Sequence, residues 1–149
     1  SLVADLDRPD VTALLLAGVA PAWFNLLDLQ RIHEETELPT LSVSFEASEG
    51  LAPAISEQFD GRERDWRLAR YESLPPRCAL SVNDERVFVR AVGAETRQNP
   101  DADTPTLAPN CEAARIVRGH TPEGGRPEPL RVARLVARAG RAFVTERRE

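Results

Sequence analysis

The feature that most restricts the fold is a short apolar run that ends at a glycine. Residues 11–16 are almost continuously apolar, and Asp10 and Gly18 bound them. A run of this length and composition is typical of a strand that is buried on both faces. We therefore expect a strand at residues 12–17 to lie in the centre of its sheet.

Residues 25–45 add a helix and a second strand to this run. Leu26, Leu29 and Ile32 recur at helical spacing within residues 25–37. Asn25 can cap this helix by accepting a hydrogen bond from a backbone N–H one turn further on. Residues 40–45 alternate between polar and apolar side chains, which predicts a strand. The order strand, helix, strand predicts a parallel pair joined by a right-handed crossover.

The remaining pattern predicts a single α/β domain over residues 1–149, with a mixed sheet flanked by helices. Residues 2–7 are typical of the end of a helix, and residues 95–109 are rich in proline and acidic side chains. We expect residues 95–109 to form a flexible, solvated insertion that can be deleted with little effect on the melting temperature. Helices are expected at residues 53–59, 62–74, 110–118 and 129–142, and a hairpin at 78–93.

The composition bounds the classes of function. All 19 basic residues are arginine beside 24 acidic residues, which is typical of halophilic microbes. The net charge of −5 argues against non-specific binding of nucleic acid over the whole surface, but it allows a local basic face. No apolar run approaches the ~20 residues that cross a bilayer, and the first residues lack the charged-then-apolar pattern of a leader, so we do not expect a secreted or membrane protein. Cys78 and Cys111 have no metal or redox spacing, so we expect reduced thiols in a cytoplasmic protein without a membrane partner.

The predicted final helix carries a row of arginines. Arg131, Arg134, Arg138 and Arg141 fall within an arc of about 80°, and Val132, Val136, Ala139 and Phe143 lie on the far side, where we expect them to face the core. The arginines are either a stripe that binds phosphate or an ordinary solvated face. Glu128 is expected at the helix start, where the helix dipole favours a carboxylate.

Other candidate residues leave two interpretations each. Trp23 and Phe24 could stack on a base, or they could belong to the core. Glu46, just beyond the second strand, could be a catalytic acid or a solvated carboxylate. His33 and His120 lack zinc-like spacing, so no metal site is assigned to them.

Two stretches resemble a known archaeal family. The segment "LLLAGVAPAWFNLLDLQRIHEETELPTLSVSF" resembles the central part of the uncharacterised endonuclease dU family, which is related to endonuclease V. The segment "GGRPEPLRVARLVARA" resembles the closing helix of that family. The Phe24-Asn25 pair and the Pro-Glu-Pro-Leu-Arg motif at residues 127–131 are the most specific parts of the match.

The resemblance implies a ribonuclease H-like, endonuclease V-like fold. It also implies cleavage of damaged or deaminated DNA or RNA by Mg²⁺ ions held on carboxylates. The family has Leu-Asp-Gly where this chain has Leu16-Ala17-Gly18, and a methyl group cannot bind Mg²⁺. The other acids of such a site come from earlier strands, which we expect to lie upstream of Ser1.

Three hypotheses therefore remain. The chain is a metal-dependent nuclease with a rearranged ligand set, a binding module that has lost its metal, or an interaction domain without nucleic acid. No catalytic residue and no metal ligand is assigned. The predicted contacts with nucleic acid are Trp23, Phe24, Asn25, Arg126, Arg131 and Arg134, and the last three are expected to contact phosphate.

Overall fold

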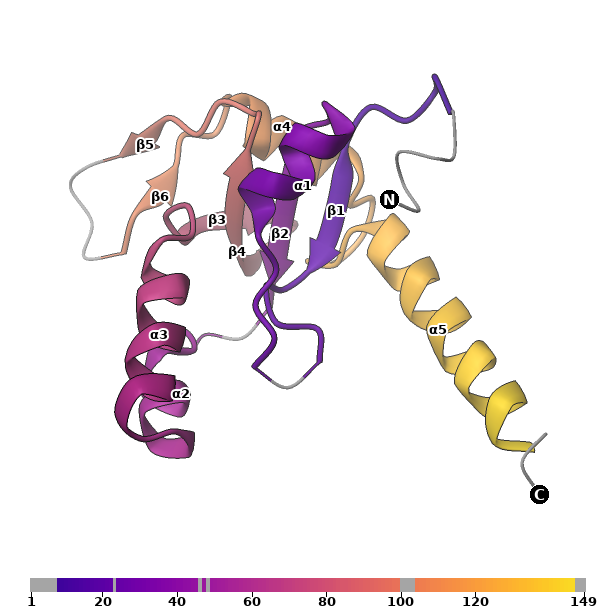
Figure 1. Cartoon of the computed structure of the whole chain (residues 1–149). Helices are drawn as coiled ribbons and strands as arrows, with labels where there is room; N and C mark the ends of the chain where they lie inside the picture. The colour runs from indigo at the N-terminus through magenta and orange to yellow at the C-terminus, as the bar shows by residue number, and fades with distance from the viewer. Residues whose placement is uncertain (1–7, 23, 46, 48, 100–103, 147–149) are drawn as a thin grey trace.

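The computed structural model describes residues 8–22, 24–45, 47, 49–99 and 104–146, and it confirms a parallel pair of strands at the start of this part. Strand β1 (Leu14–Ala17) pairs in parallel with β2 (Thr40–Ser44), so that Leu14 lies opposite Thr40 and Ala17 opposite Val43. Helix α1 (Leu29–Thr36) connects the two strands and lies over the sheet (Figure 1). Both strands therefore end at the same edge of the sheet. The helix end expected at residues 2–7 lies outside the described residues.

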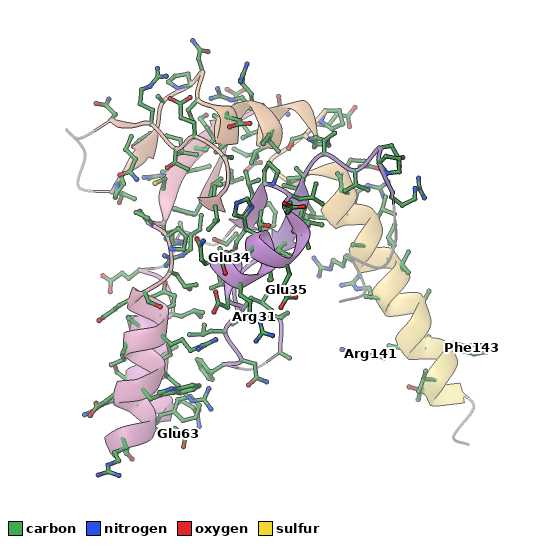
Figure 2. All side chains as sticks on the ribbon, turned by 45° about the horizontal axis from the view of Figure 1, so that its top comes forward. Arg31, Glu34, Glu35, Glu63, Arg141 and Phe143 are labelled. Carbon is green, nitrogen blue, oxygen red and sulfur yellow. The ribbon has the colours of Figure 1, made fainter. Side chains whose placement is uncertain are left out.

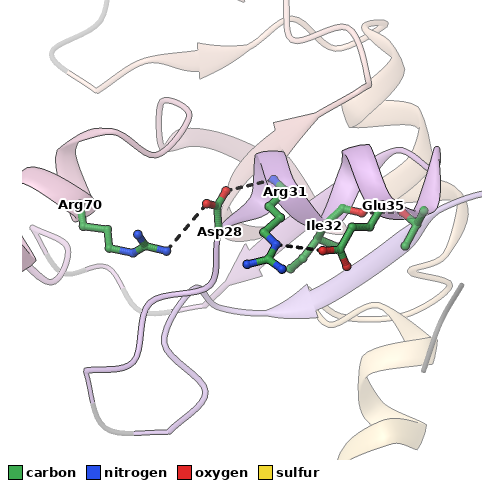
Figure 3. A network of polar contacts seen from close by, with 6 residues as sticks. Asp28, Arg31, Ile32, Glu35 and Arg70 are labelled. Carbon is green, nitrogen blue, oxygen red and sulfur yellow. Dashed lines mark hydrogen bonds and ion pairs between the residues drawn. The ribbon is translucent and has the colours of Figure 1, made fainter. Parts of the chain in front are cut away.

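Helix α1 begins later than expected, and Asp28 rather than Asn25 caps it. The Asp28 carboxylate accepts a hydrogen bond from the Arg31 backbone N–H at 3.0 Å (Figure 3). Residues 25–27 instead belong to the loop after β1, where the Leu27 N–H donates to the Val19 carbonyl at 2.8 Å. The apolar spacing of Leu26 therefore reflects packing of this loop, and the expectation for Asn25 was wrong.

The six strands of the described residues form one mixed sheet in the order β1-β2-β4-β3-β6-β5. Strands β3 (Cys78–Val82) and β4 (Glu85–Val92) make the expected antiparallel hairpin. Asn83 and Asp84 form its turn with positive φ angles of 48° and 64°, which matches the twist of the strands. This sheet confirms the predicted α/β architecture. It also shows that β1 is an edge strand among the described residues rather than a central one.

Residues 95–109 do not form one uninterrupted loop, contrary to the expectation. Strand β5 (Gln98–Asn99) pairs with β6 (Thr106–Leu107), and β6 continues the sheet beside β3. Leu107 is buried, and the Ala79 N–H donates to the Pro105 carbonyl at 2.7 Å. Because this segment contributes backbone hydrogen bonds and a core side chain, we now expect its deletion to destabilise the fold.

Helices cover both faces of the sheet. Leu41 and Val43 of β2 pack with α4 (Glu112–Gly119) in one hydrophobic cluster, in which Cys78 and Cys111 are buried as free thiols. The alternate residues of the strands face the other side, where Leu29 of α1 packs with residues of α2 (Ala52–Gln58) and α3 (Gly61–Glu72). Both faces of β2 are therefore covered, and even Thr40 and Ser42 are buried.

The final helix does not place its apolar side against the core. Helix α5 (Glu128–Glu146) buries Leu130 near its start and then extends away from the sheet (Figures 1 and 2). Val132, Val136 and Phe143 are 45%, 66% and 58% exposed. Helical periodicity correctly groups these residues on one face, but this face remains largely exposed in the described part of the chain. None of the described helices is long and apolar enough to cross a membrane.

Candidate functional site

A pocket of about 420 Å³ opens where β1 and β2 end. The Gly18 N–H closes this end by donating to the Val43 carbonyl at 3.0 Å, and a φ of +83° at Gly18 turns the chain out of β1. Ala17 is exposed beside it and lines the pocket. The position where the family resemblance implies an acid therefore lies at a pocket and carries a methyl group.

Three arginines from separate parts of the chain line this pocket. They are Arg77 before β3, Arg90 on β4 and Arg126 before α5. Each guanidinium lies over an aromatic ring. Arg77 is 3.7 Å from the centroid of Phe88, Arg126 is 4.0 Å from that of Phe45, and Arg90 is 4.9 Å from that of Tyr71. Such stacking restricts the orientation of the flat guanidinium group.

Arg90 is the most firmly anchored of the three. It is 9% exposed, and its Nη1 donates to the carbonyl of Pro75. The antiparallel register places it opposite Ser42, on the sheet face that α1 covers. The buried stem of Arg90 therefore carries a permanent positive charge to the floor of the pocket.

Tyr71 of α3, over whose ring Arg90 lies, also lines the pocket. Its hydroxyl accepts a hydrogen bond from the Leu51 N–H at 3.1 Å, which ties the start of α2 to α3. Gly50 lies against this hydroxyl with a φ of +97°, and a Cβ at this position would be 2.3 Å from the Tyr71 oxygen. Glycine is therefore required here for both conformation and space.

Among the described residues that line the pocket, all the charged side chains are basic. No aspartate or glutamate is among the residues of the described chain that line it, whereas three guanidinium groups are. Glu46, the candidate acid beyond β2, lies outside the described residues. Within the described part, no group of three or more His, Cys, Asp or Glu side chains could hold a metal ion. These donors suit an anion such as phosphate and do not suit a divalent cation.

The structure distributes the predicted nucleic-acid contacts over three places. Arg126 lines the arginine pocket, whereas Phe24 and Asn25 line a second, separate pocket. Arg131 donates to both carboxylate oxygens of Glu128 on α5, at 2.7 and 2.5 Å. Arg134 is exposed further along the same helix. Trp23 lies outside the described residues.

Arg77 and Arg90 were missed as site residues. Arg90 could have been found, because it stands between Phe88 and Val92 on one face of an alternating strand, and a charge between two apolar side chains is unusual there. Arg77 follows two prolines and carries no comparable signal. Only the folded sheet brings it to the end of β1.

Comparison with known proteins gives consistent matches from archaea. The family model described as "Endonuclease dU" matches residues 1–103. A UPF0215 protein of Thermococcus kodakarensis is 29% identical over 130 residues, covering 87% of this chain and 58% of that protein. A UPF0215 protein of Pyrococcus furiosus is 30% identical over 149 residues, covering 93% of this chain and 63% of the relative. The chain thus spans about three fifths of the length of these relatives.

A solved structure supports the fold. The crystal structure of a protein of unknown function from Archaeoglobus fulgidus aligns with a TM-score of 0.62 and 24% identity, covering 87% of this chain and 64% of that one. This likeness concerns the α/β fold alone. With the family model matching more than half of its residues, the chain belongs to the endonuclease dU family.

Proposed function

We propose that this chain is a nucleic-acid-binding domain whose arginine pocket holds a phosphate group of a DNA or RNA strand. The observation that carries the proposal is the convergence of Arg77, Arg90 and Arg126 at the end of β1. Guanidinium groups bind phosphate oxygens in pairs, and their attraction strengthens where solvent is partly excluded. A local site of this kind is compatible with an acidic chain, because the positive charge is concentrated in one place.

Magnesium-dependent cleavage of damaged or deaminated strands is the second candidate. The printed name of the family supports it. The residues that line the pocket do not fit Mg²⁺, because this ion needs hard oxygen ligands and three guanidinium groups repel it. We therefore expect this chain to produce no chelator-sensitive cleavage of inosine- or uracil-containing strands. Products that scale with protein and disappear with chelator would favour the second candidate.

The binding proposal is tested by measuring anisotropy of a labelled single strand over a series of salt concentrations. Arg126→Gln removes one charge from the pocket and keeps a polar side chain. We expect a several-fold loss of affinity and a decrease of about one in the slope of log affinity against log salt. Arg115→Gln is the matched control, because Arg115 is exposed on α4. Helix α4 lies toward the end of the sheet opposite to the end of β1 (Figure 1).

The two variants separate a local site from general charge. Equal losses for Arg126→Gln and Arg115→Gln would mean that the strand responds only to net charge. No binding of the wild-type chain at low salt would overturn the proposal.

A further inference from the structure

The second pocket has a different character from the first. It has a volume of about 330 Å³ and is lined by Phe24, Asn25, Leu26, Trp66, Arg67 and Arg70. Trp66 is 58% exposed, although it is the largest aromatic side chain of α3. An indole left in water beside an open pocket is a candidate surface for a flat ligand.

The inner wall of this pocket is held rigidly by Arg67. Its Nη1 donates to the Phe24 carbonyl at 2.8 Å, and its guanidinium lies 4.2 Å from the centroid of Phe59. An ion pair of 2.9 Å with Glu63 holds the same group from the side. Phe24 packs edge-on against Phe59 with a centroid separation of 5.2 Å. The loop that carries Phe24 and Asn25 is therefore fixed to α3.

The outer rim is formed by Arg70. Its guanidinium is 3.8 Å from the Asp28 carboxylate, which also caps α1 (Figure 3). Both side chains are nearly half exposed, so this ion pair is weak and open to competition. The guanidinium groups of Arg70 and Arg67 also lie over the Trp66 ring, 5.8 and 5.7 Å from its centroid. Arg70 can therefore turn toward an anion without losing a buried contact.

Asn25 adds an uncharged group that can form hydrogen bonds with a ligand. Its amide has one acceptor oxygen and two donor hydrogens, and it is exposed at the pocket. No side-chain hydrogen bond joins it to another residue in the described part of the chain. A nucleobase presents a flat π-face together with donors and acceptors at its edge, which matches an indole beside an amide.

We infer that this pocket accepts one unpaired base of the bound strand, stacked on Trp66. Asn25 contacts the edge of the base, and Arg70 contacts the adjacent phosphate. This inference rests on the proposed function, because it names the part of the strand that a second site recognises. The two sites bind different parts of the strand: the arginine pocket holds a phosphate, and the Trp66 pocket holds a base.

The test compares two single strands of equal length and charge, one with ordinary bases and one built from abasic sugar-phosphate units. We expect the wild-type chain to bind the base-containing strand about tenfold more tightly, which corresponds to stacking of one base on an aromatic side chain. Trp66→Ala should remove this preference, while the abasic strand still binds through the arginine pocket. Trp66→Phe should keep most of the preference. Phe143→Ala, which truncates an equally exposed aromatic side chain on α5, should keep all of it.

Each outcome distinguishes the two proposals. If the wild-type chain binds both strands equally, the base site is excluded and phosphate binding stands. If it binds neither strand, the proposed function fails and this inference fails with it. A preference that survives Trp66→Ala would overturn the stacking role. Should Trp66→Ala fail to fold, the wild-type comparison and Trp66→Phe still decide, since complete loss of the preference with Phe would contradict stacking.

Discussion

Two sets of arginines in this protein differ in how they are placed. Arg77, Arg90 and Arg126 come from separate segments and line one pocket at the end of β1. Each of their guanidinium groups lies over an aromatic ring. The arginines of α5 follow one another along a single helix that extends into solvent. Helical spacing makes the second set conspicuous in the sequence, whereas sheet register assembles the first. A row of like residues on a helix is therefore a weaker indication of a site than convergence from distant segments.

The two sets also differ in how strongly each charge can attract a phosphate group. A guanidinium in a pocket acts through a medium of lower effective dielectric constant and loses little mobility when it binds. An arginine on an exposed helix is screened by salt and must become ordered on binding. We therefore expect the pocket to set the affinity for phosphate and α5 to add a salt-dependent contribution.

The largest expected effect concerns Arg90→Met. This change removes the hydrogen bond to the Pro75 carbonyl and the contact with the Tyr71 ring while it keeps most of the side-chain volume. We expect the free energy of unfolding in urea to fall by about 2 kcal/mol and phosphate-dependent binding to be lost. Arg134→Met is the control and should change stability by less than about 0.5 kcal/mol. Similar losses for both variants would show that the pocket arginine is no better anchored than the helical one.

The next effect concerns Ala17→Asp, which places a carboxylate at the position implied by the family resemblance. The new charge lies in a pocket lined by three guanidinium groups, so it should compete with phosphate. We expect affinity for a single strand to fall about tenfold, equivalent to ~1.4 kcal/mol, and calorimetry to detect no Mg²⁺ binding. Ala17→Asn, which is similar in size but uncharged, is the control. Measurable Mg²⁺ affinity in Ala17→Asp would indicate that a carboxylate cluster is otherwise intact and would support the nuclease hypothesis.

The contrast also shows what the sequence could predict. The parallel pair and the hairpin follow from local patterns, namely an apolar run, an alternating segment and the Asn83-Asp84 turn. The same patterns cannot say which strand lies at the edge, because this depends on what else pairs with β1. Periodicity likewise groups Val132 and Val136 on one face of α5, but it does not tell whether another element covers that face.

The sites were predictable only in part, for a related reason. Phe24, Asn25 and Arg126 are predicted contacts, and the structure places them at two pockets. Their partners Trp66 and Arg90 come from α3 and β4, and nothing in the local sequence connects those segments to the loop after β1. Such pairings depend on tertiary packing.

A smaller effect is expected for Arg134→Ala on α5. If this residue contacts phosphate as the sequence predicts, the slope of log affinity against log salt should decrease by about one unit. Because the residue is exposed, the affinity at high salt should hardly change, unlike in Arg126→Gln. An unchanged slope would leave Arg134 as ordinary surface charge and would restrict phosphate binding to the pocket.

The smallest effect is expected for Glu128→Gln, which tests whether Arg131 is available to a ligand. Arg131 lowers the pKa of the Glu128 carboxyl by donating hydrogen bonds to it, so the ion pair contributes to stability above pH 4.5. This contribution is lost as the pH falls through the lowered pKa of the folded state. At neutral pH the carboxylate neutralises Arg131, and Glu128→Gln should raise the salt slope by up to about one unit.

Glu112→Gln is the matched control for this change, because Glu112 is also an acidic residue in the first turn of a helix, α4. It should leave the salt slope unchanged. The Glu128→Gln variant should also lose less stability than the wild-type chain when the pH falls below 4.5, since it lacks the carboxyl that titrates. If the stability at low pH changes in this way while the salt slope does not, the ion pair of Arg131 has been removed but Arg131 does not bind a phosphate. Arg131 would then be excluded from the binding surface.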